Sequence, residues 1–374
     1  MAMNADAIVV GGGLVGSAIG YGLACEGLRP VVLDEGDVAL RASRGNFGLV
    51  WVQSKGLGNP PYQRWSRTSS ELWPELAERL RTETGIGVGH HRPGGVCVCL
   101  TDEEFGAREQ MMHAMRSQMG EDGFDYRMLD RGELKELLPG IGPAVVGGSW
   151  SPYDGHANPL YTLRALHAGL AARGGRYVPE AKVQTLSAAS GIFTAATAHG
   201  RFQAPRLVLA AGLGSAALAA QVGLHIPVFP VRGQIIVTER IAPLLRMPTL
   251  ILRQTDEGSV MIGESREEGR NDDQSGIEVV HRLAARAVAT FPLLAGVRMV
   301  RTWAALRVMS PDGYPIYEQS ESCPGAFAAT CHSGVTLAAA HALRYAKYVA
   351  QGSLPEEFQV FHSRRFGSDV RLAS

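Results

Sequence analysis

Three glycines near the start of the chain have the spacing of a phosphate-binding turn. Gly11, Gly13 and Gly16 form the pattern G-x-G-x-x-G, which follows an apolar strand pattern at residues 7–10 and precedes a helix pattern of small residues. Glycine lets the backbone approach a pyrophosphate closely, and the positive end of the helix favours the negative charge. Asp34 ends the next strand pattern, where a carboxylate can accept hydrogen bonds from both hydroxyls of a ribose. The sequence therefore predicts a dinucleotide site and leaves FAD and NAD open.

The segment after Asp34 favours FAD. A conventional NAD domain would enter another helix promptly, whereas residues 41–49 form a polar, glycine-punctuated loop that suits an extended cofactor or a plain surface loop. Ser43, Asn46 and Gly48 give this loop the pattern S-x-x-N-x-G. It resembles the loop that runs along the flavin in the D-amino acid oxidase, or glycine/sarcosine oxidase, superfamily. The resemblance implies an FAD-dependent oxidoreductase.

The resemblance spans nearly the whole chain. Residues 154–159 look like the segment that opens the family's middle helix, and residues 181–183 resemble the strand whose backbone meets adenine. Residues 207–212 are similar to the second cofactor strand. The resemblance and the glycine motif together give a predicted set of FAD-contacting residues: Gly11, Gly13, Leu14, Val15, Gly16, Asp34, Glu35, Ala42, Ser43, Asn46, Phe47, Gly48, Val183, Ala211, Gly212, Ser333, Gly334, Val335, Thr336 and Leu337.

Arg307 is the predicted substrate anchor. Residues 301–316 resemble the family's third motif, in which this arginine pairs with a substrate carboxylate. A guanidinium suits that role because its planar fork makes two charge-assisted hydrogen bonds to a carboxylate. The alternative is an ordinary salt bridge to a surface acid. Two further residues are expected to be structural, Asp312 as a turn cap and Arg232 on an edge strand.

The last long helix pattern follows residues 330–337, and the resemblance places such a helix start against the flavin pyrimidine ring. There the N–H groups of residues 334–337 would stabilise the negative charge of the reduced flavin. His332 can tune the flavin or contact the substrate, and capping the helix is an equal alternative. Lys55, just past the flavin loop, is a candidate pocket residue, although lysines are usually exposed to solvent.

Two departures from the family pattern bear on these roles. Relatives can carry a second substrate-binding arginine after a G-H pair, whereas this chain reads Cys331-His332 and lacks that arginine. No cysteine stands near Ala305, where relatives with a covalent flavin can have one, so FAD is expected to bind non-covalently. No metal site is predicted, because Cys97 and Cys99 lie two apart in a strand pattern that suits core packing.

The composition limits the kinds of partner. The chain has 374 residues, 45% of them apolar and 19% charged, and Lys+Arg and Asp+Glu both total 36. Without net positive charge, binding to a nucleic-acid backbone is not expected. No apolar run reaches the roughly 18 residues that a transmembrane helix needs. Five cysteines at irregular spacing are unlike a disulfide framework, so we expect reduced thiols and a cytoplasmic protein.

The strand and helix patterns predict an α/β fold, in which a Rossmann-type FAD-binding domain is interleaved with an antiparallel-sheet α+β substrate domain, as in D-amino acid oxidase-like proteins. Residues 1–85, 150–222 and 300–374 are assigned to the first domain, and residues 86–149 and 223–299 to the second. Strands are expected at residues 7–10, 30–33, 94–100, 206–210, 226–239, 249–253, 259–262 and 300–307. Helices are expected at residues 14–27, 65–81, 101–120, 158–173, 281–290 and 334–350.

Within the superfamily, residues 45–55, 232–240 and 301–307 look closest to the flavoprotein β subunits of D-hydroxyproline dehydrogenase, opine (octopine/nopaline) oxidase and hydrogen cyanide synthase. The resemblance implies oxidation of a C–N bond beside a carboxylate, with hydride transfer to flavin N5 and hydrolysis of the resulting imine. Two alternatives stay open. The resemblance to β subunits implies that the chain can belong to an assembly with iron–sulfur partner chains, and because it has no four-cysteine cluster motif itself, any cluster must lie in a partner. The other alternative is a protein that retains flavin without turnover. No motif identifies the substrate or the electron acceptor.

Overall fold

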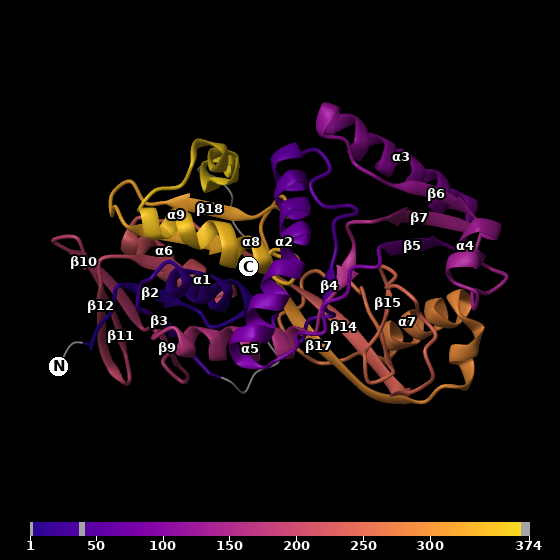
Figure 1. The fold of residues 1–374 in the computed structure, drawn as a ribbon, viewed down its shortest axis with the longest axis horizontal. Helices are drawn as coiled ribbons and strands as arrows, with labels where there is room; N and C mark the ends of the chain where they lie inside the picture. The colour runs from indigo at the N-terminus through magenta and orange to yellow at the C-terminus, as the bar shows by residue number, and fades with distance from the viewer. Residues whose placement is uncertain (1–2, 37–41, 368–374) are drawn as a thin grey trace.

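The computed structural model describes residues 3–36 and 42–367, so Arg41 of the predicted flavin loop lies outside the described residues. A large sheet with its helices forms the left part of Figure 1, two smaller antiparallel sheets form the right part, and α2 (Pro60–Thr84) stands between them. Within the described ranges, no helix is both long and apolar enough to cross a membrane.

The large sheet is the predicted nucleotide-binding sheet. Its strands are parallel except for the β18–β19 pair, and β2 lies at the centre with β3 and β13 beside it. All four residues of β2 are buried, which fits a strand that is covered by helices on both faces. In spatial order the strands are β18 (Ile316–Gln319), β19 (Ala326–Thr330), β13 (Leu207–Leu209), β2 (Ala7–Val10), β3 (Pro30–Leu33) and β9 (Arg176–Val178).

The first helix of this part packs closely against the last one. A Cβ atom on Gly22 of α1 (Leu14–Cys25) would collide with the Ala342 carbonyl oxygen, so the two backbones approach each other at a glycine. The last helix was expected at residues 334–350, but residues 334–337 form a turn and the regular helix begins only afterwards. It consists of α8 (Ala338–Ala340), a π-helical turn (His341–Tyr345) and α9 (Ala346–Gln351).

A separate four-stranded sheet lies at the outer edge of the nucleotide-binding part, and the sequence patterns did not predict it (Figure 1). The strand expected at residues 181–183 is absent: these residues are irregular, and the next strand along the chain begins at Thr185. The sheet consists of β1 (Met3–Asn4), β12 (Gly200–Ala204), β11 (Ile192–Thr197) and β10 (Thr185–Ala189).

The second part contains two antiparallel sheets. The long strands β14 and β17 pair over most of their length, and β14 also pairs with β16, so Arg232 lies on an inner strand rather than on the predicted edge strand. The first sheet is ordered β15 (Leu252–Gln254), β16 (Ser259–Ile262), β14 (Phe229–Arg240) and β17 (Met299–Met309), and the second β5 (Gly95–Cys99), β7 (Gly147–Ser151) and β6 (Arg127–Asp130). The remaining elements are α3 (Asp102–Met119), α4 (Arg131–Leu137), α5 (Pro159–Ala172), α6 (Ser215–Ala219), α7 (Ile277–Thr290) and the short pair β4 (Leu49–Val50) and β8 (Gly155–His156).

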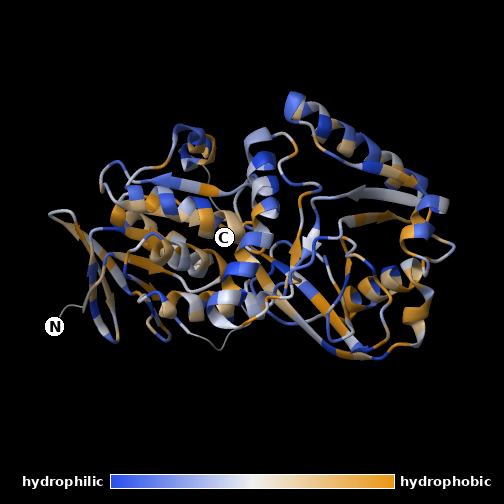
Figure 2. Ribbon diagram, in the orientation of Figure 1, coloured by the Kyte–Doolittle hydropathy of each residue, from blue (hydrophilic) through white to orange (hydrophobic). Residues whose placement is uncertain are grey.

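Hydrophobic residues gather on the strands of both parts, whereas α3 at the outer edge is mostly hydrophilic with scattered apolar positions (Figure 2). The domain boundaries predicted at residues 150 and 300 fall inside β7 and β17. The division into domains remains a proposal. Because β17 pairs with β14 as far as Met309, we propose that the boundary predicted at residue 300 lies after Met309 instead.

Candidate active site

The glycine motif forms a turn that only glycine can complete at two positions. Gly11 has φ +108°, and a Cβ atom there would overlap the Ala210 carbonyl oxygen of the neighbouring strand. A Cβ atom on Gly16 would overlap the Gly11 carbonyl oxygen, so α1 can begin this close to β2 only with glycine at this position. The backbone therefore has the cradle shape that a pyrophosphate requires.

The N-terminus of α1 lies within the glycine turn, since its N-cap residue is Gly13. The N-cap residue Gly13 supplies no side-chain cap, and the first turn carries no acidic residue. Ser43 of the predicted flavin loop accepts a hydrogen bond from the Leu14 N–H at 2.9 Å. A hydroxyl oxygen thus occupies the kind of position that a phosphate oxygen takes at a helix N-terminus.

Asp34 directly follows β3 and lies across from the glycine turn. Its carboxylate accepts hydrogen bonds from the Gly12 N–H at 2.6 Å and from the Gly36 N–H at 3.1 Å. Gly12 was not among the predicted residues, although its place inside the motif could have identified it. The next residue, Glu35, pairs with Lys182 at 3.4 Å.

A cavity of about 930 Å³ runs from this turn toward the last helix. Most predicted FAD contacts line it: Gly11, Gly13, Leu14, Val15, Asp34, Glu35, Ala42, Ser43, Asn46, Val183, Ala211, Gly212 and Gly334. Gly16, Gly48 and Leu337 line neither this cavity nor the one next to it. Gly48 instead permits a close approach, since a Cβ atom there would lie 2.5 Å from the Ala157 carbonyl oxygen. Tyr177, which no sequence pattern identified, also lines this cavity, and its ring lies against Gly12 and stacks on His167.

A second cavity of about 250 Å³ lies beyond the first. The two cavities share Ala42, Asn46, Leu306 and His332 in their walls, so they are neighbouring compartments of one site. The remaining predicted residues line the second compartment: Phe47, Lys55, Arg307, Ser333, Val335 and Thr336.

Arg307 projects from β17 into the second cavity. A Cβ atom on Gly233 of the paired strand would lie 2.6 Å from the Arg307 Cζ atom, so this glycine makes the space for the guanidinium. Arg307 Nη1 donates to the Ser265 carbonyl at 2.6 Å, and no described carboxylate lies within ion-pair distance of it. Burial lowers the pKa of Arg307. The surface salt bridge that was the alternative for this residue is therefore not formed.

Lys55 lies half-buried beside His332 rather than exposed to solvent. Its Nζ lies 3.4 Å from His332 Nδ1, and desolvation by the surrounding protein lowers the pKa of Lys55 to about 8. Asp154 holds the turn that carries Lys55. Its carboxylate accepts hydrogen bonds from the Val52 N–H at 2.5 Å and from the Gln53 side chain at 2.6 Å. Burial raises the pKa of Asp154 to about 7.

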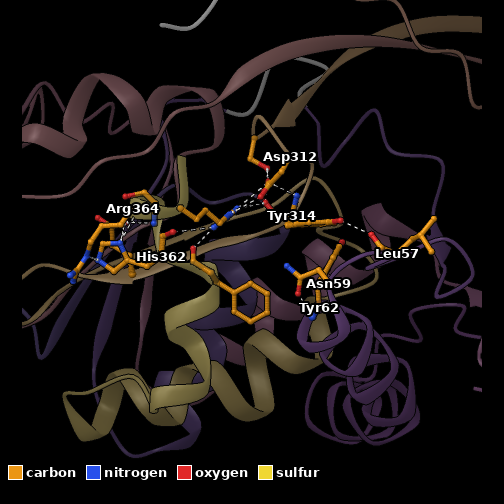
Figure 3. Close-up of polar contacts among 12 residues, drawn as sticks. Leu57, Asn59, Tyr62, Asp312, Tyr314, His362 and Arg364 are labelled. Atoms are coloured by element: carbon orange, nitrogen blue, oxygen red, sulfur yellow. Dashed lines mark hydrogen bonds and ion pairs between the residues drawn. The ribbon is translucent and has the colours of Figure 1, made fainter. Parts of the chain in front are cut away.

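The same turn is also held from the side of the 310–314 segment (Figure 3). The Tyr314 hydroxyl donates to the Leu57 carbonyl at 2.5 Å, and Asn59 caps α2 by accepting from the Tyr62 N–H at 3.1 Å. Asp312 accepts from the Tyr314 N–H at 3.0 Å, which confirms its predicted role as a turn cap, and it pairs with Arg365.

The turn before α8 is rigidly anchored. Tyr62 contacts Ser333 through their hydroxyls at 2.9 Å, and Thr336 accepts from the Trp51 N–H at 3.1 Å. The Leu337 N–H already donates to the Ser333 carbonyl at 2.9 Å, so Leu337 does not offer the free donor that was expected. Burial holds the pKa of His332 well below its usual range, which keeps its imidazole neutral.

Arg232 forms ion pairs within the protein, and Cys97 and Cys99 are free cysteines on β5. Arg232 is 3% exposed and forms ion pairs with Glu267, at 2.6 Å, and with Asp272. Burial raises the pKa of both Cys97 and Cys99. Among the described residues, no three His, Cys, Asp or Glu side chains are grouped as metal ligands.

Comparisons with known proteins agree with the site. The model of the DAO family, described as FAD dependent oxidoreductase, matches residues 6–348. An opine oxidase subunit of Agrobacterium tumefaciens (strain Ach5) is 43% identical over 361 residues, which cover 96% of this chain and 97% of that protein. Hydrogen cyanide synthase subunit HcnC of Pseudomonas aeruginosa is 27% identical over 409 residues, which cover 96% of each protein.

The fold of this chain also matches that of a solved flavoprotein relative. The solved structure of glycine oxidase from Geobacillus kaustophilus matches with a TM-score of 0.88 at 26% identity and covers 99% of this chain and 100% of that one. The predicted superfamily, its fold and FAD as the cofactor are thereby confirmed. The chain belongs to the DAO family of FAD-dependent oxidoreductases.

Proposed function

We propose that this protein oxidises the C–N bond of a small amine that carries a carboxylate. The observation that carries the proposal is the Arg307 guanidinium, which faces a cavity adjoining the cofactor compartment and has no carboxylate partner within the described protein. A planar cation of this kind binds a carboxylate through two hydrogen bonds and so fixes the neighbouring carbon atom.

FAD, when bound, supplies the acceptor for the two electrons and the hydrogen that leave the α-carbon, and the resulting imine hydrolyses in water. The residues of the chain orient the substrate beside the cofactor compartment. Arg307 holds the carboxylate end, and neutral His332 lines both compartments without adding a charge. Lys55, with a pKa of about 8, can exchange a proton near neutral pH.

The names of the relatives support an amine or amino acid substrate. Opine oxidase and glycine oxidase are named for nitrogen-bearing substrates, and the opine oxidase subunit is 43% identical to this chain. D-hydroxyproline remains a further candidate from the resemblance of residues 45–55, 232–240 and 301–307. Opines, glycine-like amines and D-amino acids form the panel to be tested.

Anaerobic reduction of the bound flavin tests the proposal directly. Glycine, sarcosine, both enantiomers of proline, D-hydroxyproline, octopine and nopaline are mixed with the FAD-loaded protein, and loss of the yellow absorption is followed by stopped flow. At least one amine should bleach the flavin at a saturable rate. A flavin that stays oxidised with all of them would reject catalysis and favour a protein that only retains flavin.

Arg307→Ala should raise the apparent dissociation constant of the reactive amine on the order of 100-fold, because two charge-assisted hydrogen bonds are lost. FAD content should not change. Arg301→Ala is the matched control, since Arg301 lies on the same strand, is exposed and stacks on Trp303. Unchanged affinity in Arg307→Ala would show that the carboxylate binds elsewhere.

A second proposal concerns partner chains. Two relatives are named as subunits, one of opine oxidase and one of hydrogen cyanide synthase, which favours a role within a multi-subunit complex. The predicted partners carry iron–sulfur clusters that take electrons from the flavin. If so, the isolated chain should be reduced by its amine but reoxidised slowly by oxygen and quickly by a dye acceptor. Rapid reoxidation by oxygen alone would favour an independent oxidase.

A further inference from the structure

The substrate cavity contains a charged side chain that no motif identified. Glu264 follows β16 and lines the 250 Å³ cavity together with Arg307 and Lys55. Its side chain is exposed to solvent, and the protein that surrounds it still raises the pKa of its carboxyl group. Its carboxylate has no hydrogen-bond or ion-pair partner among the described residues. The carboxylate is therefore available to a ligand.

The backbone holds Glu264 in an unfavourable conformation. Its φ of +70° lies in the left-handed region, which glycine occupies freely and a residue with a Cβ atom enters at a cost. Such strain persists where the surrounding structure requires it and is concentrated at functional sites. The preceding Gly263 lies against Phe47, another residue of the cavity wall, so the segment cannot easily shift away.

Three charged residues of the cavity wall, Glu264, Arg307 and Lys55, do not pair with one another, whereas Arg266 in the same wall pairs with Glu268 at 2.8 Å. The Glu264 carboxylate lies more than 4.0 Å from the nitrogen atoms of Arg307 and Lys55, since no ion pair joins them within the described part of the chain. Burial raises the pKa of Glu264, while Arg307 and Lys55 oppose that shift. A ligand with a positive charge near the carboxylate would oppose it further.

A cavity in which the Arg307 guanidinium and the Glu264 carboxylate both lack an ion-pair partner among the described residues complements a ligand that carries both charges. We propose that Glu264 binds the cationic nitrogen of the substrate, so that the site selects zwitterionic amino acids over carboxylates that lack a charged nitrogen. This inference rests on the proposed function, in which Arg307 holds the carboxylate of the same ligand.

A matched pair of ligands tests this selection without turnover. 2-Aminoisobutyrate and pivalate have nearly the same shape and differ in an ammonium group against a methyl group. Because 2-aminoisobutyrate has no α-hydrogen, its α-carbon cannot be oxidised. Isothermal titration calorimetry of the FAD-loaded protein gives both dissociation constants. The wild-type protein should bind 2-aminoisobutyrate on the order of tenfold more tightly, as expected for one charge-assisted hydrogen bond.

Glu264→Gln should abolish this preference and leave the affinity for pivalate within about twofold, since only the partner of the ammonium group is changed. Glu264→Gly removes the carboxylate and also relieves the positive φ, so it should fold and lose the preference too. Glu136→Gln, on the exposed face of α4, is the control and should keep the wild-type preference.

The inference is overturned if the preference survives in both Glu264 variants, if the wild-type protein binds pivalate as tightly as 2-aminoisobutyrate, or if neither ligand binds saturably. These results are distinct from failure of the proposed function. A protein that prefers 2-aminoisobutyrate but whose flavin no amine reduces would keep the recognition role of Glu264 and lose the catalytic proposal.

Discussion

At the scale of single residues, the substrate site depends on the space that Gly233 leaves for Arg307. A methyl group at Gly233 would lie 2.6 Å from both Cζ and Nη1 of Arg307, and the obstructing group is the movable end of a side chain. Gly233→Ala should therefore fold and bind FAD but displace the guanidinium. We expect the dissociation constant of pivalate to rise on the order of tenfold.

Calorimetry with pivalate measures this effect, with Gly276→Ala as the matched control. A Cβ atom on Gly276 has its nearest neighbour at 3.8 Å, on the side chain of Gln234, so that variant should bind like the wild-type protein. Equal affinities in Gly233→Ala and the wild-type protein would mean that Arg307 does not bind the carboxylate from the position it now has.

The lowered pKa of Lys55 should make the free energy of unfolding depend on pH. Its pKa is about 8 in the folded protein against an ordinary value of 10.5, so the folded state disfavours the protonated form. The resulting destabilisation is complete below pH 8 and fades as the pH rises toward 10.5, because the unfolded chain binds the extra proton across that window. Lys55→Met should stabilise the protein on the order of 1 kcal/mol at about pH 7, with a smaller gain at about pH 10.

Urea unfolding of both proteins at these two pH values measures the difference. An equal gain at both would show that Lys55 has an ordinary pKa in the folded state. A loss of stability at neutral pH would show that its contact with His332 and its longer-range attraction to Glu264 outweigh the cost of burying the charge.

At the scale of elements, the glycine turn explains why the first strand and helix were predictable. Ala7–Val10 and Leu14–Cys25 lie where the patterns put them, because a buried apolar run and a tight turn leave local signals. The closing helix was placed too early, since its first regular turn depends on how residues 331–337 are anchored by Tyr62 and Trp51. Such anchoring is tertiary and leaves no periodicity in the sequence.

The same distinction applies to the site. Arg307 and Lys55 could be predicted because a family motif or a neighbouring loop marked them. Glu264 could not, because its significance comes from a positive φ and from charges that lie far away in sequence, on β17 and after β4. Arg232 was placed on an edge strand because the pattern of β14 does not reveal that it pairs on both sides.

Binding of FAD should depend on Gly16 in the glycine turn. Gly16→Ala would place a Cβ atom on the Gly11 carbonyl oxygen, which belongs to the backbone and cannot move aside. We expect the purified variant to contain less than about a tenth of the wild-type FAD, as a cost above about 1.4 kcal/mol implies. Gly106→Ala in α3 is the control, because nothing lies within 4 Å of its Cβ position and alanine favours helix. Full FAD content in Gly16→Ala would contradict the cradle.

At the scale of the whole molecule, residues from the first and last parts of the chain line the cofactor compartment, and residues of the antiparallel sheet line the substrate compartment. β14 and β17 bring Gly233 and Arg307 to the end of the cavity that begins at Gly11. Because these segments are remote in sequence, binding of FAD should stabilise the tertiary structure as a whole. A ligand that binds only the folded state adds about 2.7 kcal/mol at roughly 100 times its dissociation constant.

FAD should bind this protein without a covalent bond and should stabilise it against unfolding. The one described cysteine that lines the cofactor compartment is Cys331, and burial raises its pKa to about 12, so its thiol stays protonated and is a poor nucleophile toward a flavin ring. FAD should therefore be released intact when the protein is heated or precipitated with acid, and added FAD should raise the unfolding midpoint of the apoprotein by several degrees. Absorption of the supernatant measures the first effect and differential scanning fluorimetry the second. Yellow colour retained in the washed precipitate would establish a covalent bond and contradict the prediction, whereas Gly16→Ala, which lacks the cradle, should show no shift with FAD.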